Sequence, residues 1–577
     1  MAEWIVQVNE RIGGLVWGTP MVLLFLGTGV YFTVRSGFFQ LRHAKLIGTK
    51  TFFALFHSSS ATRSNDKKSL SQFQALSTAL AATLGNGNIV GVATAISAGG
   101  PGAVFWMWVS AFFGMMTHFA ESVLGIYFRY RNENGEWLGG PMYYLEAGLK
   151  NKKLGRFLAI SFALLCMLAS FGIGNMTQVN SISAAMRTSF GVSEWFCGIV
   201  LALLAGTVIL GGVGRIGRVT EKLVPVMSIL YIVACVTVFI LNIRQVPYVF
   251  SSIFKSAFSF EAVAGAGSGL VMKRAVSMGF RRGIFSNEAG LGSSVMAHCA
   301  ADVKEPVEQG MWGIFEVFAD TILVCTLTAF VLLSSTADVL PLNEALQKVD
   351  TTPRYVSLDH TAGVVPLVQT GTHPKFQLGS SKGIPKTVTT VDGGEYTIYF
   401  QPPDEKDYVF TNVMVLRGQQ AKEEDGSLLF TEQGKPVIAS VALEELDGIS
   451  LAVYAFSQRF GPLAGKVLSI AVLLFAFATV LGWSVYGTQA AEYLFGMGAK
   501  IPFQLLFVLM IVFGATQSMG LVWNISDTLN GLMALPNLIG ILSLSGLVFD
   551  ILKNYEQRQR GALKAPIRSA YQELIRK

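Results

Sequence analysis

The stretch Leu84-Gly85-Asn86-Gly87-Asn88-Ile89-Val90-Gly91 lies within an apolar segment, residues 71–98, that is long enough to cross a membrane. Glycine and asparagine are poor helix formers, so a helix is predicted to break at this point. Lipid tolerates non-helical backbone only where it lines a cavity or is buried in protein. The break therefore indicates that backbone amides and carbonyls face a binding site for a small polar solute or an ion.

Composition places the chain among all-α, polytopic membrane proteins. Of its 577 residues, 51% are hydrophobic and 14% are charged, whereas soluble domains carry about 25% charged residues. The net charge of +7 does not indicate a nucleic-acid partner, because many basic residues cluster in short segments between apolar runs. The five cysteines form no CxxC pair, which predicts neither a disulfide framework nor a zinc site.

Eleven apolar runs reach the length of roughly 20 residues that a membrane-spanning helix needs. The seventh run is the least regular, because Lys273, Arg274, Arg281 and Arg282 fall inside it. The predicted spans are 15–34, 71–98, 103–128, 157–186, 195–213, 221–243, 261–290, 309–333, 463–494, 502–523 and 528–551.

Basic residues indicate the orientation of these spans. They gather in segments 35–70, 129–156 and 214–222 and in the tail 552–577, which all fall on one side of the membrane under an eleven-span count. Because positive charge favours the cytoplasmic side, the N-terminus is predicted outside and the C-terminus in the cytoplasm, with the chain in the plasma (inner) membrane. The arginine pair 281–282 is accordingly placed at the cytoplasmic end of span seven.

The same orientation places residues 334–450 outside the cell. Short alternating runs at 386–391 and 395–400 predict a small β-rich insert there. A loop elaboration without chemistry of its own is the favoured interpretation of this insert. The predicted domains are an N-terminal extra helix (1–34), a helical core in two parts (71–333 and 451–551), the insert (334–450) and a basic cytoplasmic tail (552–577).

Spans two to six and seven to eleven form two units of five helices when the first helix is set aside. Each unit opens with a glycine-interrupted helix, since Ala264–Gly269 interrupts span seven as Leu84–Gly91 interrupts span two. Because five is an odd number, the two units must run in opposite directions, which predicts an inverted repeat with a site between the broken helices. The alternative is that these glycines only permit close packing of helices.

A helix broken at mid-depth can bind both an anion and a cation. The N-terminus of the second half-helix favours a carboxylate. Carbonyls freed in the preceding turn, from Ala81 through Thr83 to Leu84, can coordinate a hard cation such as sodium. The alternative is a flexible kink or a contact between helices through small residues. The presence of Asn86 and Asn88 in one break favours the binding site.

Two further spans carry polar groups. In span four, the segment Gly172–Asn180 is slightly more typical of interhelical hydrogen bonding than of a pocket. In span nine, Thr479, Trp483 and Tyr486 share one helical face. That face suits either a small cavity with one polar corner or a tryptophan packed in the bundle, and the spacing does not decide between them.

Isolated charged residues inside spans keep a functional interpretation open. His118 is expected to be structural, and Glu121 is expected to pair with a basic group near the cytoplasmic face. Glu316 and Asp320 in span eight can be either structural or functional. Asp527 is expected to cap a helix in an exterior turn.

Five segments of the sequence are 85–96 (GNGNIVGVATAI), 139–148 (GGPMYYLEAG), 172–175 (GIGN), 282–293 (RGIFSNEAGLGS) and 475–483 (FAFATVLGW). Together they resemble the alanine/glycine:cation symporters, also called sodium:alanine symporters. The resemblance covers residues 15–333 and 450–550 and leaves out the insert. It implies a LeuT-like fold, with a 5+5 inverted repeat preceded by one extra helix, and sodium- or proton-coupled uptake of a small neutral amino acid.

The resemblance also implies roles for residues around the break. Gly87 and Asn88 are implied to seat the substrate carboxylate, and carbonyls near Ala81 and Leu84 are implied to belong to a cation site. Glu261 either helps to hold the substrate ammonium or faces the exterior water. The implied substrate-binding residues are Gly85, Asn86, Gly87, Asn88, Asn175, Thr479 and Trp483, and the implied cation-binding residues are Ala81, Thr83, Leu84 and Thr479.

The function predicted from these features is inward symport of a small neutral amino acid, such as alanine or glycine, with sodium or a proton. Thr479 and Trp483 are implied to wall the pocket and limit substrate size. The predicted partners are the amino acid, Na+ or H+, and the lipid bilayer, without nucleic acid and without a cofactor beyond the coupling ion. An amino-acid sensor or channel that keeps the pocket without coupled transport is the alternative. A membrane enzyme is disfavoured, because the sequence shows no nucleophile–base pair or metal-ligand cluster at membrane depth.

Overall fold

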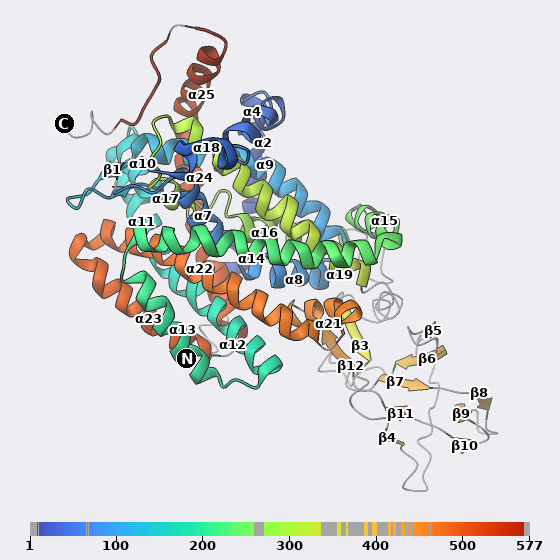
Figure 1. Cartoon of the computed structure of the whole chain (residues 1–577). Coiled ribbons are helices and arrows are strands. Elements are labelled where there is room, and N and C mark those ends of the chain that lie inside the picture. The colour runs from blue at the N-terminus through green and yellow to red at the C-terminus, as the bar shows by residue number, and fades with distance from the viewer. Residues whose placement is uncertain are drawn as a thin grey trace.

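The computed structural model describes residues 9, 11–64, 66, 68–258, 270–335, 448–461, 463–517, 519–562 and 564–570, together with ten short strands between 355 and 446. These residues form a helical body, from which α21 leads toward the strands (Figure 1). The predicted second break at Ala264–Gly269, Glu261, most of the insert and the end of the tail lie outside the described residues.

Among the described residues, eight helices are long and apolar enough to cross a membrane. A ninth span results if α7 (Gln72–Thr83), η1 (Gly87–Gly91) and α8 (Val92–Gly99), which bend by 51°, are counted as one. The other eight are Arg11–Arg35 with α2 (Thr19–Arg35), α9 (Gly102–Phe128), Lys152–Arg187 with α11 (Lys152–Phe171), η2 (Gly172–Met176) and α12 (Thr177–Phe190), α14 (Val213–Leu241), Pro306–Ser335 with α18 (Pro306–Val317), η4 (Phe318–Cys325) and α19 (Thr326–Ser335), α22 (Leu463–Phe495), Met497–Ala515 with η6 (Met497–Ala499) and α23 (Lys500–Ala515), and Ile525–Ser543 in α24 (Met519–Ser543).

The expected count of eleven spans is therefore not confirmed. α13 (Glu194–Ile209) corresponds to a predicted span but is shorter than the others, and α16 (Leu270–Asn287) carries four basic residues. The last predicted span, 528–551, is interrupted, because α24 ends at Ser543 and α25 (Ser545–Gln559) begins after Leu544.

Short elements fill the segments between the long helices. The basic segments 35–70 and 129–156 fold into small helices and one hairpin rather than remaining extended. These elements are α3 (Phe39–Arg42), α4 (Ala44–Lys50), α5 (Ala54–His57), α6 (Ser59–Thr62), β1 (Tyr130–Arg131), β2 (Trp137–Leu138) and α10 (Pro141–Gly148), and elsewhere η3 (Ile243–Gln245), α15 (Val246–Ala257), α17 (Val295–His298) and α21 (Gly448–Phe460).

Strands occur in the segment for which a β-rich insert is predicted. β5 (Lys386–Thr389) and β6 (Glu395–Phe400) fall on the two alternating runs and pair antiparallel. The sheets have the orders β4-β11-β7-β6-β5, β10-β9-β8 and β12-β3. The remaining strands are β3 (Tyr355–Leu358), β4 (Val365–Pro366), β7 (Val413–Leu416), β8 (Gln419–Lys422), β9 (Leu428–Glu432), β10 (Lys435–Pro436), β11 (Ala439–Ser440) and β12 (Leu443–Leu446).

Two long helices organise the helical body. α9 packs against α16 and α18, and α22 packs against α7, α11 and α12. Close approach of α22 to α7 depends on Gly482, because a Cβ atom there would lie 2.7 Å from the backbone nitrogen of Ala82. This contact places α22 against the last turn of α7, immediately before the helix break.

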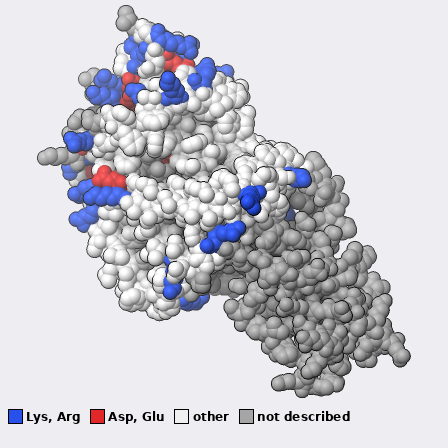
Figure 2. Space-filling view, turned by 45° about the vertical axis from the view of Figure 1, so that its right-hand side comes forward, with Lys and Arg blue, Asp and Glu red and all other residues white. Residues whose placement is uncertain are grey.

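Charged side chains occupy a small part of the surface. In the view of Figure 2, the acidic side chains of the described residues lie near the top and at the left edge, basic side chains lie there and also singly further down, and uncharged surface separates them. Arg281 is an exception, because it pairs with Asp527 inside α24 and Asp527 is only 2% exposed. The prediction that Asp527 caps a helix in a turn is wrong, since it lies within α24 and pairs with Arg281. The placement of Arg281 at the cytoplasmic end of a span stays a prediction.

Candidate functional site

The helix break falls where the sequence predicts it. α7 starts with a capping box, in which the Ser71 hydroxyl accepts from the Gln74 amide at 3.1 Å and the Gln74 Oε1 atom accepts from the Ser71 amide at 3.0 Å. The helix ends at Thr83, and π-helical η1 begins at Gly87. The sequence Leu84–Asn86 thus separates two half-helices whose axes differ by 51°.

The break redirects backbone hydrogen bonds. In a continuous helix the Gly85 amide would bond to the Ala81 carbonyl. Here it donates to the Thr83 carbonyl at 2.9 Å and to the Asn88 Oδ1 atom at 3.0 Å. The Asn88 amide likewise bonds to the Gly85 carbonyl at 3.2 Å instead of the Leu84 carbonyl. The carbonyls of Ala81 and Leu84 thereby lose their usual helical donors, which is the arrangement that binds cations in broken membrane helices.

A buried carboxylate lies beside the break. The Asn88 Nδ2 atom donates to Oδ1 of Asp320 at 2.7 Å, and the hydroxyls of Ser286 and Thr321 donate to Oδ2 at 2.8 and 2.7 Å. All four residues are fully buried. In the described part of the chain, the ion pairs formed by lysine and arginine do not include Asp320. A carboxylate buried without a positive partner requires a cation or a proton beside it.

Irregular elements bring this carboxylate and its donors together. Asp320 lies in η4, a π-helical stretch within the span Pro306–Ser335, and Asn88 lies in η1, which is also π-helical. Ser286 comes from the last turn of α16. Because π-helical turns recur at functional sites, the meeting of two such stretches at one buried acid makes this place a candidate functional site.

Thr479 and Gln178 flank the break. A side chain at Gly85 would overlap the Thr479 Oγ1 atom, so this glycine permits the contact. The Thr479 hydroxyl donates to the Phe475 carbonyl at 3.1 Å, which leaves its oxygen available as an acceptor. The Gln178 Oε1 atom accepts from the Asn86 amide at 3.4 Å, so α12 also contacts the break.

Trp483 lies one turn after Thr479 on α22. It is 1% exposed, and a Cβ atom on Gly174 would overlap its side chain. The Tyr486 ring lies edge-on to it, with 5.4 Å between ring centroids. The indole thus fills the space between α22 and η2, next to the elements that surround the break.

The two asparagines predicted to bind substrate have different surroundings. The Asn175 Nδ2 atom donates to the Phe507 carbonyl of α23 at 2.6 Å, so this side chain contacts α23. The Asn86 Nδ2 atom donates to the Thr177 carbonyl at 3.5 Å. The Oδ1 atoms of both asparagines are buried and lack a hydrogen-bond partner within the described residues. Such acceptors can receive a hydrogen bond from a polar ligand.

Several residues of this arrangement were not predicted as site residues. For Asp320, the sequence gives one general indication of a functional role, which is an acidic residue inside an apolar run. Ser286, Thr321 and Gln178 carry no comparable local signal, because hydroxyls and amides are common in membrane helices. Asn88 was assigned to the substrate carboxylate, whereas its side-chain amide is committed to Asp320 and Ser286.

A second buried polar cluster lies away from the break. His118, His298 and Glu316 bring three potential metal-ligand atoms within 4.8 Å of one another, all fully buried. The three residues come from separate elements, so no local pattern in the sequence indicates that they meet. The prediction that no metal-ligand cluster lies at membrane depth stays a prediction. Glu121 pairs with His118, whose Nδ1 atom lies 3.0 Å from the carboxylate. His118 is therefore part of a network rather than an isolated structural histidine.

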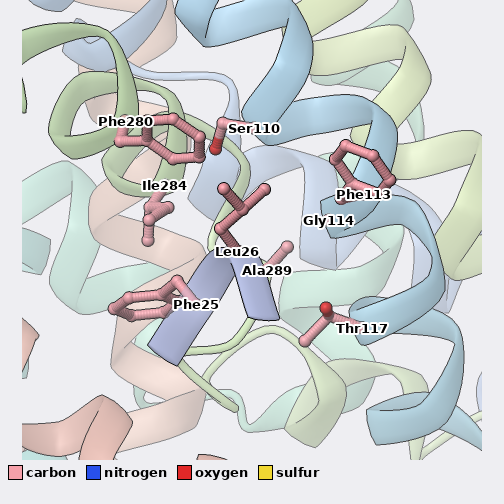
Figure 3. A pocket seen from close by; sticks show the side chains of 9 residues that line it. All are labelled: Phe25, Leu26, Ser110, Phe113, Gly114, Thr117, Phe280, Ile284 and Ala289. Carbon is pink, nitrogen blue, oxygen red and sulfur yellow. The ribbon is translucent and has the colours of Figure 1, made fainter. Parts of the chain in front are cut away.

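A small pocket opens between α2, α9 and α16 (Figure 3). Its lining is largely apolar, with Phe25, Phe113 and Phe280 among the side chains and Ser110 and Thr117 as hydroxyls. The pocket shares no lining residue with the break or with Asp320. It therefore does not supply the polar contacts that a zwitterionic solute would need.

Comparisons with known proteins agree on one family. The model of the "Sodium:alanine symporter family" matches residues 2–360 and 430–569. The chain is 37% identical over 559 residues to "Sodium/alanine symporter AgcS" of Methanococcus maripaludis, covering 97% of this chain and 99% of that protein. It is 33% identical over 568 residues to "Probable sodium/glutamine symporter GlnT" of Bacillus subtilis, covering 97% and 93%. It is 40% identical over 333 residues to "Putative sodium/proton-dependent alanine carrier protein YrbD" of the same organism, covering 58% and 64%.

Proposed function

The chain belongs to the sodium:alanine symporter family, and from this premise we propose that it imports a small neutral amino acid, alanine or glycine, together with sodium. The family makes the chain a multi-pass membrane transporter that couples amino acids to a cation, and not an enzyme. The observation that supports the cation most strongly is the buried carboxylate of Asp320, which meets neutral donors on η1, α16 and η4.

Two groups of oxygen atoms near the break suit the coupling ion. One consists of the carbonyls of Ala81 and Leu84, with the Thr479 hydroxyl across from Gly85. The other is the Asp320 carboxylate. Sodium is a hard cation that prefers oxygen ligands, and a negative ligand offsets part of its dehydration cost. Sodium bound at either position would link the broken helix to α22 or to η4.

The substrate carboxylate is assigned to the backbone at Gly87, the first residue of η1. The Gly85 and Asn86 amides already donate to the Asn88 and Gln178 side chains. The side-chain amide of Asn88 is occupied by Asp320, so the amide at the start of η1 is the better candidate. The buried Oδ1 atom of Asn86 is an acceptor suited to an ammonium group. Trp483 bounds the space beyond Thr479 and favours a side chain no larger than a methyl group.

The remaining features follow the family resemblance. The proposed architecture is a LeuT-like 5+5 inverted repeat of eleven spans, with one extra N-terminal helix and a β-rich exterior insert. The N-terminus lies outside, and the basic tail lies in the cytoplasm. One repeat rocks against the other around the broken helices, so that the site opens alternately to each side.

Uptake of labelled alanine into proteoliposomes tests the proposal. An imposed inward sodium gradient is expected to accumulate alanine above its external concentration, and replacing sodium with potassium is expected to abolish this accumulation. Equilibration without accumulation would instead indicate a channel, and saturable binding without flux would indicate a sensor. Preference for glutamine, named for one relative, would correct the substrate while leaving the coupling intact.

The Trp483→Ala variant tests the wall of the pocket. Removing the indole is expected to let leucine or glutamine compete with alanine, lowering their inhibition constants by about tenfold, because a methylene in an apolar pocket is worth about 1–3 kcal/mol. Competition in the same uptake assay measures this change. Tyr493→Phe, a change on the same helix that removes only a hydroxyl bonded to Glu146, serves as the control. An unchanged size preference would show that Trp483 does not bound the substrate.

A further inference from the structure

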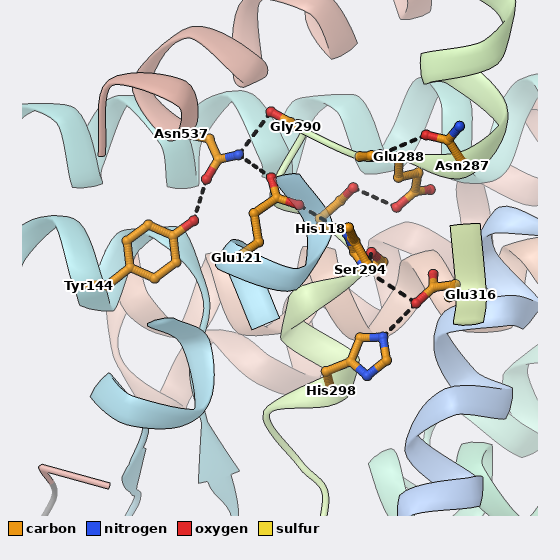
Figure 4. Close-up of polar contacts among 12 residues, drawn as sticks. His118, Glu121, Tyr144, Asn287, Glu288, Gly290, Ser294, His298, Glu316 and Asn537 are labelled. Atoms are coloured by element: carbon orange, nitrogen blue, oxygen red, sulfur yellow. Dashed lines mark hydrogen bonds and ion pairs between the residues drawn. The ribbon is translucent and has the colours of Figure 1, made fainter. Parts of the chain in front are cut away.

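A cluster of imidazole and carboxylate groups joins α9, α17 and α18 (Figure 4). The Nε2 atoms of His118 and His298 lie 3.2 and 2.5 Å from the same Glu316 Oε2 atom. The Ser294 hydroxyl lies 3.2 Å from the Nε2 atom of His118. All four residues are fully buried. Their polar atoms therefore meet one another without contact with bulk water.

The far side of each imidazole is held by another side chain. The Nδ1 atom of His118 lies 3.0 Å from the Glu121 carboxylate, and the Nδ1 atom of His298 lies 2.6 Å from the Gln309 amide. Such outer contacts fix the ring and the tautomer of metal-binding histidines, so that the other nitrogen faces the metal. In this cluster both histidines have this outer contact, and both direct Nε2 at one point.

Two buried oxygens in the cluster are unsatisfied within the described residues. They are the Oε1 atoms of Glu316 and Gln309. A cation bound by both carboxylate oxygens would satisfy the first. If the Gln309 amide is flipped, its Oε1 atom can accept a hydrogen bond from the Nδ1–H group of His298 and is then satisfied. In that tautomer the Nε2 atom of His298 carries no proton, so its electron pair can bind a metal. Without a metal, and with the Gln309 amide in its present orientation, the Oε1 atoms of Glu316 and Gln309 both lack a hydrogen-bond donor.

We propose that His118, His298 and Glu316 form a binding site for a divalent transition metal of the zinc class, with the Ser294 hydroxyl or a water beside the fourth position. Two imidazoles and a carboxylate are a ligand set that zinc commonly takes. Sodium, magnesium and calcium prefer oxygen ligands throughout, so this site differs from the proposed coupling-ion sites. The cysteine pattern of the sequence does not indicate this metal site, because none of the proposed ligands is a cysteine.

The position of the site gives it a structural role in the transporter. Gly313 allows α18 to approach α9, since a Cβ atom there would lie 2.8 Å from the His118 ring. Glu316 lies one turn before Asp320 on the same span. A metal bound here would hold α9, α17 and α18 together close to Asp320. It would not take part in substrate binding.

Metal binding by the full-length protein tests the proposal independently of transport. The protein is purified in detergent, stripped with a chelator, dialysed against zinc and then against metal-free buffer, and its zinc content is measured by mass spectrometry. About one zinc per chain is expected. Cobalt substitution of the unmodified protein is expected to give the intense ligand-field absorption of tetrahedral cobalt with nitrogen and oxygen ligands.

The variants His298→Gln and Glu316→Gln are expected to lose the stoichiometric metal. His57→Gln, a change of an exposed histidine on α5, and Cys299→Ser, a change of a nearby thiol, are expected to keep it. A monodisperse, helical, stripped protein that takes up neither zinc nor cobalt would overturn the proposal and leave the cluster as a hydrogen-bond network. Metal retained by both cluster variants would also overturn it.

Discussion

The Asp320→Asn variant is expected to lower sodium-driven amino-acid uptake by about 100-fold or more. Removing one charge from a buried ion pair costs about 3–5 kcal/mol, and each 1.36 kcal/mol corresponds to a factor of ten. If the coupling cation neutralises Asp320, the amide cannot replace the carboxylate. The concentration of sodium that gives half-maximal uptake is therefore expected to rise beyond the accessible range.

The same variant is expected to fold. Asparagine keeps the shape of the side chain, and the hydroxyls of Ser286 and Thr321 can turn to accept from its amide. Elution as a single species and an unchanged helix signal in circular dichroism check this. Asp550→Asn, a change of an exposed acid on α25, is the matched control. Sodium-dependent uptake by Asp320→Asn at the rate of the parent would show that this carboxylate does not bind the coupling ion.

The break itself could be predicted because its cause is local. Two glycines and two asparagines within Gly85–Asn88 weaken a helix wherever they occur, and the structure ends α7 at Thr83. The release of the Ala81 and Leu84 carbonyls follows from that interruption by helix geometry alone. The contact of Thr479 with Gly85 also agrees with the residues chosen from the family motif.

The partners of buried polar groups could not be predicted in the same way. Asp320 has a recognisable type and place, but its donors come from η1, α16 and η4, and no spacing within one helix brings them together. Asp527 was misplaced for a related reason. The short polar stretch before it resembles a turn, yet α24 starts at Met519, and the pairing with Arg281 stabilises both charges inside the helical body.

The π-helical stretches η2 and η4 also escaped prediction. Each adds one residue to a helical turn. The sequence of η2, with two glycines and Asn175, is typical of a site of interhelical hydrogen bonding, and η4 contains neither glycine nor asparagine. The extra residue shifts the faces of the helix that follows. In the structure Gln178, in the helix that follows η2, contacts the break, whereas Asn175 within η2 contacts α23.

Gly482 is expected to be far more sensitive to a methyl group than Gly465 on the same helix. In the Gly482→Ala variant the new Cβ atom would lie 2.7 Å from both the backbone nitrogen and the Cβ atom of Ala82. Backbone cannot move aside as a flexible side chain can, so α7 and α22 must separate. Overpacking of this kind costs about 1–3 kcal/mol, which outweighs the gain of up to about 1 kcal/mol for replacing a helical glycine with alanine.

Gly465→Ala makes the same chemical change in ordinary space. Its nearest atoms, on Ser189 and Val453, would lie 3.7 Å away, which is a normal van der Waals contact. This variant is expected to keep parental uptake and to melt at the same or a higher temperature. Gly482→Ala is expected to melt several degrees lower and to lose about tenfold or more of uptake, because displacement of α7 separates Gly85 from Thr479. Thermal unfolding of both proteins in one detergent, followed by uptake in one lipid mixture, separates the two outcomes. Equal behaviour of the two variants would show that the α7–α22 contact is not a constraint on the site.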